Sequence, residues 1–119
     1  MKYDAIKTIL ENLNATEDIT SSAVVSVDGL PIVSALRAGI DEDRIGAMSA
    51  AILSLGSRAS KEVLEGRLDH AIIHANNGYM LLFEVNDFIL LAISTTEDAK
   101  LGLVLYEAKR AIKEIATEF

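Results

Sequence analysis

Residues 41–65 constrain the fold most, because they read as one long helix with two different apolar sides. Acidic residues begin it, where the helix dipole favours negative charge, and Gly66 follows as a stop signal. One side, the large apolar stripe, holds big side chains at helical spacing: Ile45, Met48, Ile52, Leu55, Ala59 and Val63. We expect this stripe to lie on the core. Beside it runs a small-residue stripe, comprising Gly46, Ser49, Ala50, Leu53, Gly56, Ser57, Ser60 and Leu64.

The small-residue stripe needs its own explanation. Gly46 and Gly56 each cost the helix about 1 kcal/mol relative to alanine, which indicates a close approach of another backbone. The two stripes together cover about 220° of the helix, more than a one-sided surface helix requires. Tight packing within the chain is one interpretation. We favour the other, in which this stripe contacts a second molecule.

Composition limits the possible functions. The chain has 119 residues, which predicts a single domain over residues 1–119. A net charge of -7 predicts no nucleic-acid binding, because phosphate contacts require a basic face. The apolar runs are too short for membrane insertion, and the first residues lack the apolar core of a signal peptide. The absence of cysteine excludes disulfides and thiolate chemistry. We expect a cytoplasmic protein.

The remaining pattern alternates helices and strands. Residues 3–13 have the spacing of a short amphipathic helix. Two strand-like runs, 23–27 and 32–36, flank Asp28-Gly29, a strong hairpin signal. Pro31 has no amide hydrogen for a ladder, so the second strand should lie at a sheet edge.

Three further runs, 68–75, 79–85 and 88–94, form a β-meander in the prediction. The last two are almost continuously apolar, as strands covered on both faces are. Residues 95–119 read as a helix with Thr95 as its cap. The expected class is therefore α+β, with the order α-β-β-α-β-β-β-α.

This order, together with the hairpin VVSVDGLPIVS at residues 24–34 and the glycine- and alanine-rich central helix, resembles the roadblock / dynein light-chain domain. The resemblance covers essentially the whole chain. It implies a five-stranded antiparallel sheet of order 2-1-5-4-3, with the central helix on one face and the two terminal helices on the other. Pro31 at an edge and the apolar strands 79–85 and 88–94 inside the sheet agree with that order.

The resemblance also implies a homodimer or a heterodimer joined through the third strand and the central helix, and a small Ras-like GTPase as partner. Of the two kinds of dimer we expect the homodimer. The implied function is that of a regulator or scaffold with no chemistry of its own. A small-molecule sensor module and a purely structural dimerisation subunit stay open as alternatives. The predicted interface consists of Gly46, Ser49, Ala50, Leu53, Gly56, Ser57, Ser60, Leu64, His70, Ile72 and His74.

Catalytic candidates are poor. No phosphate-binding glycine loop is present, and no base accompanies the serines of the central helix. His70 and His74 share one face of a strand but lie about 13 Å apart, too far to chelate one ion within a chain. With a two-fold axis near Ile72, His70 would instead lie opposite His74 of a second copy, close enough to repel when both are protonated. We expect no enzyme activity, no cofactor and no metal site.

Overall fold

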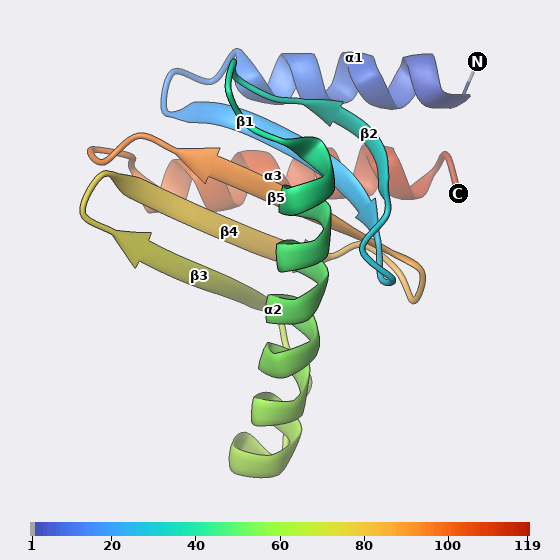
Figure 1. The fold of residues 1–119 in the computed structure, drawn as a ribbon, viewed down its shortest axis with the longest axis vertical. Coiled ribbons are helices and arrows are strands. Elements are labelled where there is room, and N and C mark those ends of the chain that lie inside the picture. The colour runs from blue at the N-terminus through green and yellow to red at the C-terminus, as the bar shows by residue number, and fades with distance from the viewer. Residues whose placement is uncertain (1) are drawn as a thin grey trace.

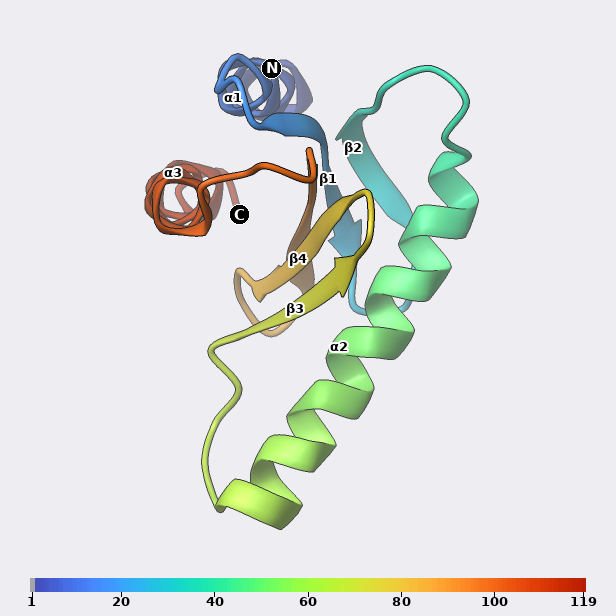
Figure 2. The ribbon, with the colours of Figure 1, turned by 90° about the vertical axis from the view of Figure 1, so that its left-hand side faces the viewer.

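A computed structural model describes residues 2–119, which form three layers (Figures 1 and 2). Their order along the chain is the predicted one. The elements are α1 (Lys2–Asn14), β1 (Ile19–Ser26), β2 (Pro31–Ala35), α2 (Glu42–Leu64), β3 (His70–Ala75), β4 (Gly78–Glu84), β5 (Ile89–Thr95) and α3 (Leu101–Ala116).

All neighbouring strands are antiparallel, in the order β2-β1-β5-β4-β3, which confirms the predicted topology. Figure 2 shows α1 and α3 on one face of the sheet and α2 on the other. The core under α1 and α3 is the larger and includes Val24, Leu81 and Ile93, whereas the core under α2 is built on Leu53, Leu82 and Leu90.

The two edges of the sheet differ. Pro31 begins β2, so the edge position predicted from this proline is confirmed. Helix α1 also covers that edge, because Lys7 Nζ and Asn14 Nδ2 donate to the main-chain oxygens of Ser34 and Ala35. Strand β3 forms the opposite edge and carries no comparable cover among the described residues. A strand can therefore be added at β3 but not at β2.

The prediction that the large apolar stripe of α2 lies on the core is wrong for most of its members, although Ile52 does pack against the core under α2. Met48, Leu55 and Val63 of the large apolar stripe are 54%, 67% and 77% exposed. Four members of the small-residue stripe face the sheet instead and are buried: Gly46, Ser49, Leu53 and Ser60. Small side chains let α2 lie close to the β1–β2 turn, where a Cβ on Gly46 would stand 2.6 Å from the carbonyl oxygen of Gly29.

The last helix is shorter at both ends than the predicted range of residues 95–119. Thr95 belongs to β5, where its hydroxyl donates to the Thr96 carbonyl, so it caps no helix. Helix α3 begins six residues later at Leu101 and ends at Ala116. The carboxylate of Asp18 accepts from the amide of Lys100 at 3.0 Å, next to the helix start. This contact joins residues 82 positions apart, so local sequence could not indicate it.

Candidate interaction surface

Helix α2 is longer than the sheet that it covers. Figures 1 and 2 show its last turns extending past β3, the edge strand. Leu53 and Leu64 point in nearly the same direction, because eleven residues make about three helical turns. Leu53 is only 5% exposed whereas Leu64 is 76% exposed, since the sheet of its own chain has ended below it. The second half of α2 therefore presents a core-type side chain to solvent.

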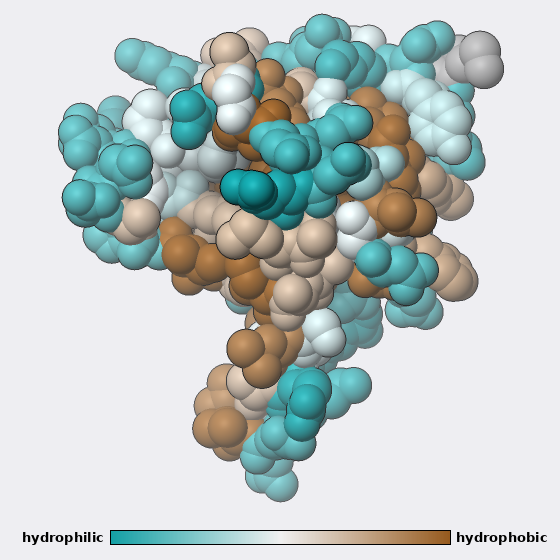
Figure 3. Space-filling view, viewed as in Figure 1, coloured by the Kyte–Doolittle hydropathy of each residue, from teal (hydrophilic) through white to brown (hydrophobic). Residues whose placement is uncertain are grey.

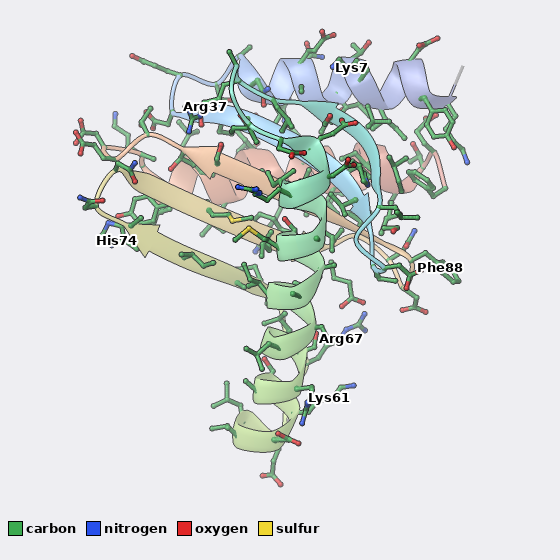
Figure 4. The ribbon with its side chains drawn as sticks, viewed as in Figure 1. Lys7, Arg37, Lys61, Arg67, His74 and Phe88 are labelled. Carbon is green, nitrogen blue, oxygen red and sulfur yellow. The ribbon has the colours of Figure 1, made fainter. Side chains whose placement is uncertain are left out.

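One flank of α2 adds to this apolar surface. The large apolar stripe turns toward the side on which β3 and β4 emerge from beneath the helix, and Figure 3 shows brown surface there. Lys61 and Arg67 lie on the opposite side (Figure 4). We call Met48, Ile52, Leu55, Ala59 and Val63 the α2 apolar flank. Ile52 is half-buried, but the other four residues are exposed, and an exposed apolar patch on a chain of net charge -7 is typical of a contact surface.

Beside this flank, α2 leaves part of the sheet uncovered. An open hollow of about 610 Å³ lies there and reaches from β3 to the start of β1. Its floor includes Ile73, Met80 and Ser94, three cross-strand neighbours on the α2 face, and Arg37 lines its far side. Thr20 Oγ1 and Ser94 Oγ are 2.8 Å apart within it. The hollow has apolar and polar parts, and β3 forms one side of it.

The free edge of β3 presents the main-chain groups of alternate residues. The amide of Tyr79 in β4 donates to Thr95 Oγ1 in β5 at 3.2 Å, so Tyr79 directs its main chain away from β3. His74 lies directly opposite Tyr79 and therefore directs its own amide and carbonyl away from β4. By alternation, Ile72 and His70 do the same. These three residues form the unpaired edge that a second strand would meet.

The structure divides the predicted interface residues into two groups. Gly46, Ser49, Leu53 and Ser60 are buried against the chain's own sheet, so they have no surface to offer, and Ala50, Gly56 and Ser57 are half-buried. Leu64, Ile72 and His74 are exposed and His70 is half-buried, all within or beside the uncovered region. Sequence reasoning missed Met48, Leu55, Val63 and Ile73. A glycine at position 46 weakens the helix, and this signal could have indicated a close contact within the chain. The partner in that contact is Gly29 of the predicted hairpin turn.

Among residues 2–119 no group of three histidine, aspartate or glutamate side chains could hold a metal ion. His70 Nδ1 lies 2.8 Å from the Asp69 carboxylate, and the His74 ring stacks on Tyr79 with centroids 4.2 Å apart. No described helix is both long and apolar enough to cross a bilayer.

Comparison with known proteins agrees with this picture of a contact-forming domain. The sequence model of the family described as the Roadblock/LC7 domain matches residues 5–95. The chain belongs to the Roadblock/LC7 family. Members of this family are generally non-catalytic regulators or scaffolds. The uncharacterized proteins MJ1340 and MJ0714 of Methanocaldococcus jannaschii are 34% and 32% identical to it, over 96% and 100% of this chain and 99% and 100% of theirs.

Solved structures of other Roadblock/LC7 proteins share the fold. MglB of Myxococcus xanthus superimposes with a TM-score of 0.90 at 18% identity, covering 98% of this chain and 96% of that one. The Roadblock/LC7 domain from Streptomyces avermitilis gives 0.87 at 18% identity, covering 93% and 94%. A structure of MglB in a tetrameric arrangement gives 0.86, again at 18% identity, with coverage of 98% and 89%. At these identities the likeness shows the fold alone.

Proposed function

We propose that this Roadblock/LC7 protein is a homodimer that binds a small Ras-like GTPase in the cytoplasm and regulates or anchors it, without chemistry of its own. The single observation that carries the dimer is the exposure of Leu64 on the sheet-facing side of α2. A helix that extends beyond its own sheet, with an apolar residue on its underside, fits a sheet supplied by a second copy.

A two-fold axis perpendicular to the sheet at β3 would bring together the free edge of β3, the α2 apolar flank and the hollow of both copies. Strand β3 would pair antiparallel with its copy, making one sheet of ten strands. The end of each α2 would then cover the hollow of the other chain, because α2 lies over the His70 end of β3 and the hollow over the other end. The two α2 apolar flanks would face one another along the middle. Each exposed surface of one copy thus covers an exposed surface of the other.

The second part of the proposal is that the dimer binds a small GTPase. It is supported by family membership, because Roadblock/LC7 proteins are generally regulators or scaffolds and the resemblance implies GTPase partners. The charged flank of α2, with Arg58 and Lys61, stays on the outside of such a dimer. The same is true of the two adjacent hairpin turns at the far end of the sheet, where the Val27 amide donates to the Phe88 carbonyl. Both remain available to a partner.

Light scattering of Leu64→Glu tests the dimer. Position 64 is exposed in one chain, so the variant should fold, yet a glutamate there would be buried without a partner in the dimer and should make it monomeric. Ser54→Glu adds the same charge at an exposed position on the charged flank and should stay dimeric. A wild-type monomer at micromolar concentration would overturn the proposal. Leu53→Glu would be a poor test, since it buries the charge in the chain's own core.

Pull-down against the small GTPases of the host, loaded with GDP or with a GTP analogue, tests the partner. We expect one of them to be retained by the wild-type dimer and to change its rate of hydrolysis or its location. The purified protein alone should not bind GTP, since no phosphate-binding loop is present. Retention of no GTPase in either nucleotide state would contradict this part and leave the dimer standing.

A further inference from the structure

We propose that the dimer binds two zinc ions, each held between His70 of one copy and His74 of the other on the face that carries α1 and α3. The inference rests on the proposed dimer, because neither site exists in a single chain. Within one chain the two histidines are separated by four strand residues, about 13 Å, which is too far for one ion.

Both histidine side chains lie on one face of the sheet. His70 is the cross-strand neighbour of Phe83 and His74 that of Tyr79, and Phe83 belongs to the core under α1 and α3. Ile72 lies between them and opposite Leu81, a residue of the same core. The two imidazoles therefore project to the side away from α2, where the partner's helix does not cover them.

The register of the dimer follows from the free edge of β3. Only His70, Ile72 and His74 direct their main-chain groups outward, and an axis through Ile72 lets all three pair with their counterparts. That axis places His70 opposite His74 of the other copy, and it does so twice. An axis through Ile73 would instead leave His70 opposite Asn76, a turn residue, and lose one pair of hydrogen-bonded residues. Both axes keep the two α2 helices on the same face.

Opposed residues of an antiparallel pair have Cβ atoms about 4.5–5.5 Å apart, a distance from which two imidazoles can reach one ion. The His70 ring is already oriented by a neighbouring carboxylate. His70 Nδ1 is 2.8 Å from the Asp69 carboxylate, which leaves Nε2 for a metal, as in the carboxylate–histidine–zinc arrangement. The His74 ring stacks on Tyr79 with an interplanar angle of 10°, and it must turn out of this stack to direct a nitrogen at the shared ion. Neutral imidazole nitrogens suit zinc, and water would complete its four-coordinate shell.

Calorimetric titration of the dimer with Zn²⁺ tests the proposal. The protein is prepared without a histidine tag and dialysed against a chelator. We expect two ions per dimer and, at a free zinc concentration ten times the dissociation constant, a dimer dissociation constant lowered about tenfold for each site. His70→Ala and His74→Ala should each abolish binding, because either change removes one ligand from both sites. Light scattering should show that both variants remain dimeric without metal.

Mixing the two variants gives the decisive result. A heterodimer of His70→Ala with His74→Ala keeps one complete site, formed by His74 of the first chain and His70 of the second. After equal amounts are exchanged to equilibrium, the mixture should recover about a quarter of the wild-type zinc capacity, although neither variant alone binds any. A site within one chain could not be restored in this way.

The outcomes separate this proposal from the dimer itself. A dimer that binds no zinc, or whose zinc binding survives either alanine substitution, overturns the zinc site and leaves the dimer intact. A mixture that recovers no binding, in a sample shown to contain heterodimers, overturns the pairing of His70 with His74. A wild-type chain that is monomeric both with and without zinc ends both proposals.

Discussion

At the scale of single residues, α2 packs very closely where it crosses the β1–β2 turn. A Cβ added to Gly46 would lie 2.6 Å from the carbonyl oxygen of Gly29, a backbone atom that cannot turn aside. We predict that Gly46→Ala lowers the free energy of unfolding by about 1–3 kcal/mol, as overpacked sites do. Urea titration measures this.

Gly102 supplies the matched control. It also lies in a helix, but nothing stands within 4 Å of an added Cβ. Gly102→Ala should therefore raise the free energy of unfolding by about 0.5–1 kcal/mol through helix propensity alone. Equal effects of the two substitutions would mean that α2 does not approach the turn as closely as described.

A second prediction concerns the hydroxyl of Ser49. Its Oγ is fully buried between α2 and the sheet and has no hydrogen-bond partner among the described residues. An unpaired buried hydroxyl costs about 1–3 kcal/mol, so Ser49→Ala should raise the free energy of unfolding by about 1 kcal/mol. Ser22 is equally buried, but its Oγ donates to Asn14 Oδ1 at 2.7 Å. Ser22→Ala should lower the stability, and the opposite signs can be compared by thermal unfolding.

At the scale of elements, the main-chain groups of β3 point alternately toward the free edge and toward β4. Proline substitutions at two successive β3 positions should therefore have different effects. The amide of Ile72 faces the free edge, so Ile72→Pro removes a group that only the dimer uses. The amide of Ile73 faces β4, so Ile73→Pro removes a hydrogen bond of the chain's own sheet. We predict that the first variant is a folded monomer and that the second is strongly destabilised. Circular dichroism with light scattering distinguishes them, and a dimeric Ile72→Pro would contradict pairing through β3.

The sequence allowed the elements and their order to be predicted, because each depends on local signals such as Asp28-Gly29, Pro31 and the apolar runs of β4 and β5. It did not decide which side of α2 meets the sheet. Large side chains favour burial, but they do so equally in a core and in an interface between copies. The choice depends on Gly29 and Gly46 meeting across the fold, a contact between distant segments. The start of α3 beside Asp18 failed prediction for the same reason.

At the scale of the whole molecule, the sheet is covered at one edge and left open at the other. The edge at β2 is covered by α1, and one face of the sheet is covered by α1 and α3. The free edge at β3, the α2 apolar flank and the hollow remain together at the other end. Because these three surfaces lie side by side, one second copy of the chain can cover them all. A closed dimer therefore accounts for their exposure better than several separate partners would.

A single cysteine tests this arrangement, since the natural chain has none. With the two-fold axis through Ile72, that residue lies opposite itself in a hydrogen-bonded pair, at a Cα separation of about 5.5 Å that suits a disulfide. Ile72→Cys should therefore oxidise to a covalent dimer, seen by non-reducing electrophoresis. Ile73→Cys should do so poorly, because that position faces the partner's Ala71. Efficient cross-linking at 73 instead of 72 would shift the axis by one residue, separating His70 from His74 while keeping the dimer.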